Sequence, residues 1–98
     1  MAGLSSTATA RTKVRGLAEA GNPCELLVCM AGKLQGKQQP GCVPVNQRFF
    51  NIRVYTPWYN PEATARTRQG VLSTCQGSAI NRATLEGIIQ RYGRSFQE

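Results

Sequence analysis

The sequence predicts an all-α fold, a small bundle of about four short helices held together by two disulfides. Apolar residues recur at helical spacing in four segments, an Asn-Pro pair precedes two of those segments, and the chain contains four cysteines. A chain of 98 residues forms one domain with a modest core, which cross-links commonly stabilise. We therefore expect a single helical domain over residues 21–94.

The residues before this domain, 1–20, are expected to form a flexible N-terminal arm. They contain few bulky apolar side chains and are rich in Ser, Thr, Ala and Gly. Arg11, Lys13 and Arg15 form a small basic cluster in this segment. Such a cluster can contact nucleic-acid phosphates, but ordinary disorder is the interpretation that we prefer.

The first helix is predicted over residues 23–34. Asn22 can cap it through its side-chain oxygen, and Pro23 suits the first helical position because the N–H that proline lacks is not needed there. Helical spacing predicts a core-facing side made of Leu27, Met30, Ala31 and Leu34.

The second helix is predicted from about residue 42 to Asn51, followed by a short extended segment at residues 52–55. Apolar residues at i, i+4 and i+7 predict an inward face made of Val45, Phe49 and Ile52. The opposite, solvated side is expected to carry Asn46, Gln47 and Arg48. The aromatic and β-branched residues that follow partly alternate with polar ones, as they do in a strand.

The third helix is predicted from Pro61 to about Cys75, and the fourth from about Asn81 to the residue before Gly93. Asn60-Pro61 repeats the start signal of the first helix. The inward residues of the third helix are expected to be Ala65, Val71, Leu72 and Cys75. The apolar stripe of the fourth helix is expected to be Leu85, Ile88, Ile89 and Tyr92.

The cysteines, Cys24, Cys29, Cys42 and Cys75, are interpreted as two disulfides. Cys24 and Cys29 lie about 140° apart around a helix axis and therefore cannot bond to each other. Zinc coordination is the alternative, but zinc ligands commonly come in pairs two to four residues apart, and the chain has no histidine. Free buried thiols are a third possibility. We expect no metal site and no cofactor.

Catalytic groups are not apparent in the sequence, and we expect that the protein is not an enzyme. There is no histidine for a triad, and the five acidic residues are scattered, one to a segment. There is no phosphate-binding glycine loop, and the cysteine spacing does not fit Cys-x-x-Cys redox chemistry.

The formal net charge of +7 favours an acidic partner, which can be nucleic acid, an anionic membrane surface or an acidic protein patch. A plainly solvated surface explains the charge equally well. One candidate interaction patch combines aromatic and basic residues: Arg48, Phe50, Arg53, Tyr55, Trp58 and Tyr59. The alternative is a loop that folds its aromatic side chains over the core, which we prefer for Phe49 and Trp58. A candidate phosphate-binding stripe on the third and fourth helices consists of Arg66, Arg68, Arg82 and Arg91.

A set of short motifs recurs in order over residues 22–93: Asn22-Pro23-Cys24, Leu27 to Gly32, Gly41-Cys42, Arg48 to Ile52, Thr67-Arg68, and Val71-Leu72 with Cys75. In this pattern the chain resembles the TrbM/KikA family. Members of this family are small secreted proteins of conjugative plasmids, encoded among the transfer genes for a type IV secretion apparatus. The resemblance implies a non-enzymatic periplasmic accessory protein that contacts another protein, a conjugation or secretion component. It transfers no catalytic residues.

The location and the pairing of the cysteines follow as further expectations. The chain shows no signal peptide and no apolar run long enough to span a membrane, so the periplasmic expectation supposes a signal that has been removed. Pairing of Cys29 with Cys42, which closes a hairpin, and of Cys24 with Cys75 is slightly preferred. The swapped pairing, Cys24–Cys42 with Cys29–Cys75, stays open. Two other functions also stay open: a basic nucleic-acid-binding protein that handles transferred DNA, and a cytosolic zinc-stabilised helical domain.

Overall fold

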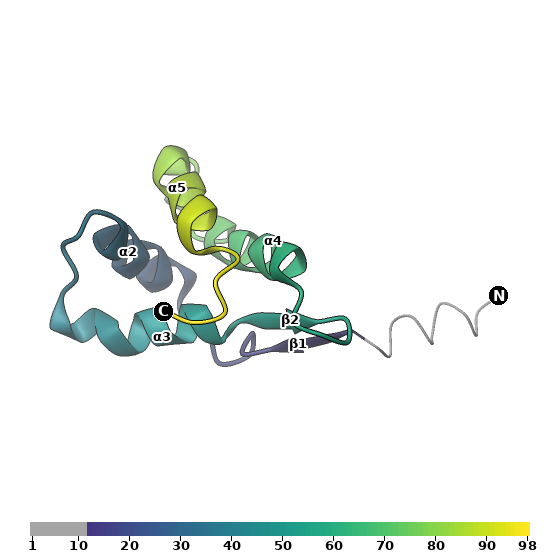
Figure 1. The fold of residues 1–98 in the computed structure, drawn as a ribbon. Helices are drawn as coiled ribbons and strands as arrows, with labels where there is room; N and C mark the ends of the chain where they lie inside the picture. The colour runs from purple at the N-terminus through teal and green to yellow at the C-terminus, as the bar shows by residue number, and fades with distance from the viewer. Residues whose placement is uncertain (1–11) are drawn as a thin grey trace.

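The computed structural model describes residues 12–98, and in this part of the chain four helices surround a small core beside a two-stranded ribbon (Figure 1). The predicted helical, disulfide-stapled fold is confirmed. The elements in chain order are β1 (Lys13–Arg15), α2 (Pro23–Leu34), a 3-10 turn (Pro40–Cys42), α3 (Val43–Asn51), β2 (Arg53–Tyr55), α4 (Pro61–Ser73) and α5 (Arg82–Tyr92).

The Asn-Pro pairs begin two helices as predicted. Asn22 Oδ1 accepts hydrogen bonds from the backbone N–H groups of Cys24 and Glu25, at 2.8 and 3.3 Å, and α2 begins at Pro23. The Asn60 side chain accepts in the same way from the N–H of the third residue of α4, at 2.9 Å. Both starts follow from the sequence because the Asn side chain accepts from free N–H groups of the first turn and proline has no N–H that needs a partner.

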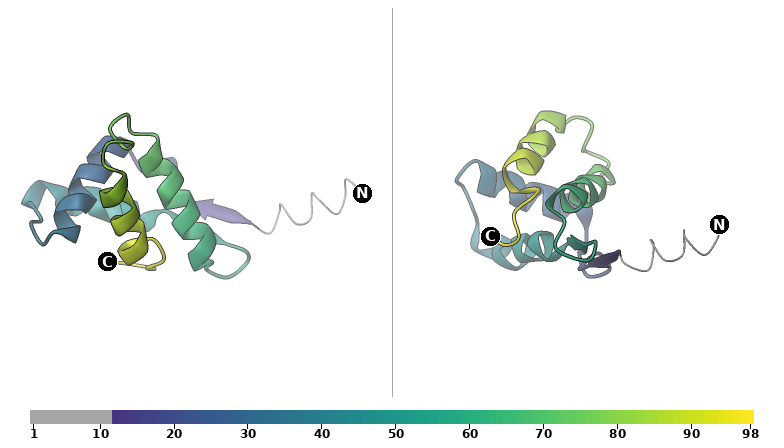
Figure 2. Two further views of the ribbon diagram at one scale, coloured as in Figure 1. Left: turned by 90° about the horizontal axis from the view of Figure 1, so that it is seen from above. Right: turned by 45° about the vertical axis from the view of Figure 1, so that its right-hand side comes forward.

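Helix α2 lies at the centre of the bundle and contacts α3, α4 and α5. The views in Figure 2 show α4 and α5 side by side, joined by the loop at residues 74–81. Six apolar side chains are completely buried between these helices: Leu26, Met30, Phe49, Ile52, Leu72 and Ile88. Of these, Leu26 was not expected to face inward.

Asn46 corrects the predicted solvated side of the second helix, because its side chain is completely buried. The buried face of α3 is wide, because Asn46 and Phe50 are buried beside Val45 and Phe49. Of the predicted solvated residues only Gln47 is exposed, and Arg48 is partly buried. In the part of the chain that the structure describes, neither Oδ1 nor Nδ2 of Asn46 has a hydrogen-bond partner.

The prediction of a flexible arm is wrong for residues 13–20. Residues 13–15 form β1, which pairs antiparallel with β2, and Ala20 is buried in the core at 3% exposure. Gly16, with φ of +79°, lets the chain after β1 pass close to the end of α3, because a side chain there would collide with the backbone carbonyl of Asn51. The rest of the predicted arm, residues 1–11, lies outside the described residues.

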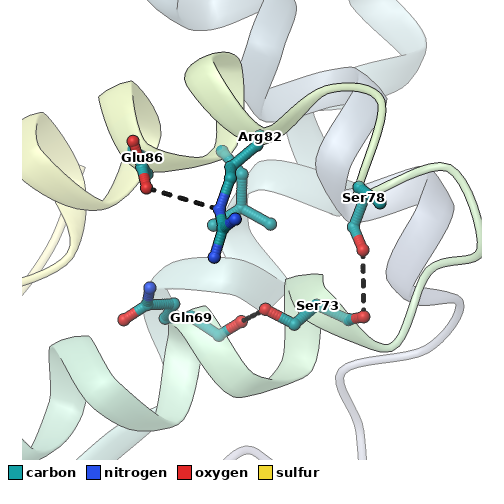
Figure 3. A pocket seen from close by; sticks show the side chains of 7 residues that line it. Gln69, Ser73, Ser78, Arg82 and Glu86 are labelled. Carbon is teal, nitrogen blue, oxygen red and sulfur yellow. Dashed lines mark hydrogen bonds and ion pairs between the residues drawn. The ribbon is translucent and has the colours of Figure 1, made fainter.

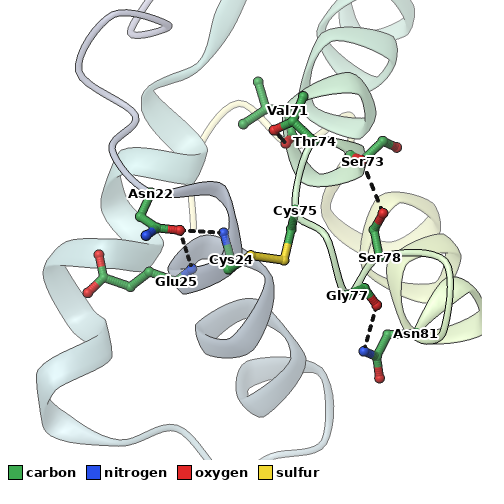
Figure 4. The surroundings of a disulfide bond; sticks show 10 residues. All are labelled: Asn22, Cys24, Glu25, Val71, Ser73, Thr74, Cys75, Gly77, Ser78 and Asn81. Carbon is green, nitrogen blue, oxygen red and sulfur yellow. Dashed lines mark hydrogen bonds between the residues drawn. A yellow bond between two sulfur atoms is a disulfide. The ribbon is translucent and has the colours of Figure 1, made fainter.

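The two disulfides join Cys24 to Cys75 and Cys29 to Cys42, so the preferred pairing is confirmed and the swapped pairing is wrong. Figure 4 shows the first bridge, which ties the start of α2 to the end of α4. The bridges span 51 and 13 residues, for which the chain-entropy relation gives about 4 and about 3 kcal/mol of stabilisation. Because all four sulfur atoms are used, the zinc alternative is wrong.

Candidate interaction surface

The ribbon and the segments beside it form a surface that we call the aromatic–basic face. Its members are Lys13, Arg15, Arg53, Tyr55, Trp58, Tyr59 and Phe96. Val14 pairs with Val54, which is buried, so these two valines share the inner face of the ribbon. Because side chains alternate along a strand, the residues on either side of each valine point outward, away from the core.

The aromatic rings of this face contact one another edge to face. The centroids of Tyr55 and Tyr59 lie 5.9 Å apart, and those of Tyr59 and Phe96 lie 5.0 Å apart. The hydroxyl of Tyr59 donates to the backbone carbonyl of Arg94 at 3.0 Å. These contacts attach the C-terminal segment to the loop that follows β2, and Figure 1 shows that segment running from α5 toward α3.

Two guanidinium groups cover this row of rings. The Cζ atom of Arg53 lies 4.0 Å from the ring centroid of Phe96, and its Nε donates to the Phe96 carbonyl at 2.9 Å. Arg15 lies 5.9 Å from the ring centroid of Tyr55. Such cation–π contacts fix the position of a guanidinium while leaving most of its donors free.

Trp58 is 81% exposed at the tip of the loop, so the prediction that it packs on the core is wrong. The loop closes on itself, since Tyr55 and Tyr59 form a β-bridge and Thr56 N donates to the Trp58 carbonyl at 2.8 Å. The side chain of Asn60 donates to Thr56 Oγ1 at 2.9 Å and braces the same turn. The closed loop therefore projects the indole away from the core, and α4 packs against β2.

The structure brings together four members of the predicted interaction patch: Arg53, Tyr55, Trp58 and Tyr59. Phe50 is 2% exposed, because its ring packs edge to face against Phe49 at 5.2 Å and Tyr92 at 5.9 Å. Arg48 donates to Glu25 at 2.7 Å and to the Ala20 carbonyl at 3.2 Å, beside the start of α2. The prediction that Phe50 and Arg48 belong to this surface patch is therefore wrong, whereas the other four predicted residues do lie together.

Arg68 is a structural residue and not a surface anion site. Its side chain is completely buried, and its guanidinium donates to five backbone carbonyls at 2.8–3.1 Å: those of Phe50, Ile52, Tyr92, Gly93 and Ser95. Burial lowers the pKa of Arg68 to about 10, so the group is still charged at neutral pH. The carbonyls at the ends of α3 and α5 are the negative ends of those helix dipoles and take the place of a carboxylate.

The other arginines of the predicted phosphate-binding stripe do not form one surface. Arg82 and Arg91 are nine residues apart on α5, which places them half a turn from each other around the helix. Arg82 Nε lies 3.7 Å from Glu86 Oε2 in an ion pair, and Arg91 Cζ lies 5.7 Å from the ring centroid of Tyr92. Arg66 is exposed on a different helix, α4. The stripe prediction is therefore wrong.

A polar pocket of about 310 Å³ lies between α4 and the start of α5 (Figure 3). The hydroxyls of Ser73 and Ser78 donate to backbone carbonyls, at 2.8 and 3.0 Å. The charged pair at its rim, Arg82 and Glu86, is 82% and 63% exposed. The pocket therefore holds no desolvated charge and no nucleophile next to a base, the features that would indicate a reaction centre.

Comparisons with known proteins do not identify this chain: no protein-family model, no curated protein and no solved structure matches it. The TrbM/KikA resemblance accordingly stays a prediction. Among the residues that the structure describes, no helix has both the length and the apolar character needed to cross a membrane. Two disulfides are typical of a protein that folds outside the cytosol.

Proposed function

We propose that this protein is a non-enzymatic accessory protein of plasmid conjugation, which acts in the periplasm by binding another protein of the transfer or secretion machinery. Three lines support the proposal. The residues at 22–93 resemble the TrbM/KikA family, the disulfides favour an oxidising compartment, and the aromatic–basic face has the composition of a protein-binding surface.

The exposure of Trp58 is the observation that carries the proposal. A tryptophan buries roughly 150–250 Å² when it is covered, and hot spots of protein interfaces are enriched in Trp, Tyr and Arg. Here one exposed indole stands on a braced loop beside two tyrosines and two arginines. Because the loop is already ordered, less conformational entropy is lost when a partner covers it.

The nucleic-acid alternative depended on a phosphate-binding set of four arginines, which does not form one surface. Arg68 is buried, and the remaining arginines of that set point in different directions. The zinc-stabilised cytosolic alternative has lost its ligands to the disulfides. Protein contact through the aromatic–basic face is therefore the function that the geometry supports best.

The test is the frequency of plasmid transfer after deletion of this gene from its conjugative element, with complementation by variants. Trp58→Ala should fail to restore transfer, because loss of a hot-spot residue of about 2 kcal/mol weakens binding roughly 30-fold. Ile80→Ala is the matched control, since Ile80 is 90% exposed on the separate α4–α5 loop and should restore transfer fully. Normal transfer without the gene, or equal complementation by both variants, would refute the proposal.

A further inference from the structure

We infer that the partner of the aromatic–basic face is an acidic protein segment, whose closely spaced carboxylates bridge Arg15 and Arg53. The inference rests on the proposed function, because it names the chemistry of the partner that binds this face. It starts from a feature of the ribbon that is unfavourable in the free protein: Arg15 and Arg53 are directly opposite each other across the two strands. Like charges in that position repel each other.

The hydrogen bonds around Val54 define the geometry of this arginine pair. Val54 N donates to Thr64 Oγ1 at 2.9 Å, and the Val54 carbonyl accepts from Asn60 N at 2.8 Å, so both groups face away from β1. The neighbouring pair of Arg15 and Arg53 is then the hydrogen-bonded type, with Cα atoms about 5.5 Å apart. Two guanidinium groups thus start from adjacent positions on one outward face.

No carboxylate of the described residues forms an ion pair with Arg15 or Arg53. Four of the five acidic residues form ion pairs elsewhere: Glu25 with Arg48, Glu62 with Arg94, Glu86 with Arg82, and Glu98 with Lys33. The fifth, Glu19, forms no ion pair with the described residues. Residues 1–11 contain no Asp or Glu, so they cannot supply a carboxylate either. Lys13 adds a third cation on the same side of β1.

The chemistry of the neighbouring rings favours a protein over a nucleic-acid strand. Single-stranded nucleic acid binds to a succession of aromatic platforms on which bases stack. On this face Tyr55, Tyr59 and Phe96 contact one another edge to face, and guanidinium groups cover Tyr55 and Phe96. Trp58 is the most exposed ring of the face, at 81% against 44% for Phe96, which suits a single anchor in a protein interface.

A membrane surface fits less well, because bilayer anchoring needs a contiguous set of apolar side chains beside the cations. The most exposed aliphatic side chains, Ile80 at 90% and Val28 at 69%, lie in the α4–α5 loop and on α2, whereas Val14 on β1 is 46% exposed. Guanidinium groups at fixed positions can bind a carboxylate through two parallel hydrogen bonds, as they also bind a phosphate, so the scarcity of apolar side chains is what counts against a bilayer. An acidic segment in extended conformation presents alternate side chains on one side and can reach both arginines.

The experiment uses Trp58, the only tryptophan of the chain, as a built-in fluorescent reporter of this face. The whole protein is titrated with a Glu-Ser repeat peptide and, as a control, with a Gln-Ser repeat peptide of the same length. We expect saturable binding of the acidic peptide with a blue shift of Trp58 emission, no binding of the neutral peptide, and weaker binding as salt increases. An oligothymidylate and vesicles that contain phosphatidylglycerol are titrated in parallel.

A matched pair of double variants separates specific contact from net charge. Arg15→Gln with Arg53→Gln should weaken peptide binding about tenfold or more, since charge-assisted contacts are lost. Arg66→Gln with Arg91→Gln removes the same net charge from α4 and α5 and should change binding less than about twofold. Equal weakening by both double variants, absence of peptide binding, or tighter binding of the oligonucleotide or the vesicles would overturn the inference.

The inference and the proposed function can fail separately. If the acidic peptide does not bind but Trp58→Ala abolishes plasmid transfer, the face contacts a partner of other chemistry and the proposed function stands. If the peptide binds through Arg15 and Arg53 but deletion of the gene leaves transfer unchanged, the acidic partner belongs to a different process. Thermal unfolding of each variant checks that the ribbon is still folded.

Discussion

Replacement of Arg68 by methionine removes the group that joins the ends of α3 and α5 to α4. The guanidinium donates to two carbonyls at the end of α3 and to three at and after the end of α5. Phe49 and Phe50 flank it, with ring centroids 5.0 and 5.4 Å from Cζ. Methionine has a similar length but no donor, so these carbonyls would lose their partner in the interior.

The size of the effect follows from three considerations. Hydrogen bonds to a charged donor contribute about 1.5–3 kcal/mol each, so a simple sum over this site would be about 7–15 kcal/mol, which equals the whole stability of a typical domain. Burial opposes this gain, as the lowered pKa of Arg68 indicates. Losses on breaking a buried charged network are about 3–5 kcal/mol, and we expect about 4 kcal/mol for Arg68→Met. For Arg68→Lys we expect about 2 kcal/mol, because an ammonium keeps the charge but has only three donors on one atom.

The assay is urea unfolding at neutral pH followed by circular dichroism, with both disulfides intact. The control is Arg66→Met, because Arg66 is exposed two residues earlier on the same helix and should change the free energy of unfolding by less than about 0.5 kcal/mol. If Arg68→Met does not fold, Arg68→Lys still gives a measurable midpoint. A loss below about 1 kcal/mol for Arg68→Met, or no loss for Arg68→Lys, would contradict our account of this site.

Three further predictions concern the rest of the domain. Asn46→Leu should raise the free energy of unfolding by about 1 kcal/mol, measured in urea, because it removes a buried amide without partners; a loss would contradict this. Replacing both Cys24 and Cys75 by serine should cost about 4 kcal/mol in the same assay, and an unchanged midpoint would contradict the entropic account. The hydrogen bond from Arg94 lowers the pKa of Glu62 from its ordinary value of 4.5. The Glu62–Arg94 pair therefore stabilises the fold above pH 4.5, and this contribution is lost as pH falls through the pKa of Glu62 in the folded protein. Carboxyl NMR titration should show this shift disappearing in Arg94→Gln.

The helices could be predicted from the sequence because their signals are local. Asn22-Pro23 and Asn60-Pro61 cap and begin their helices within one turn, and the structure has α2 and α4 starting at those prolines. The extended segment after α3 was also predicted, because the change from helical spacing to alternation occurs within the segment itself. Strand β1 was missed because a three-residue strand has almost no signal of its own and its partner is some 40 residues further along the chain.

The interior of the candidate site was harder to predict, because burial of polar groups depends on distant carbonyls. Arg68 did carry a signal: Ala65, Arg68 and Leu72 are spaced i, i+3 and i+7 on α4, and all three are buried. An arginine on an apolar stripe has to find acceptors inside the fold, here at the ends of α3 and α5. Trp58 carried no comparable signal, since its exposure depends on how the loop closes around Tyr55 and Tyr59.

The position of Arg68 also affects how variants of the aromatic–basic face should be interpreted. Its donors hold the carbonyls of Ile52 and Ser95, the residues directly before Arg53 and Phe96. Arg68 therefore fixes the backbone from which two members of that face project, although its own side chain is inaccessible to a partner. A substitution at Arg68 that lowers partner binding would thus be expected even if Arg68 contacts no ligand. Binding tests of this surface have to use Arg15, Arg53 and Trp58, whose side chains lie outside the core.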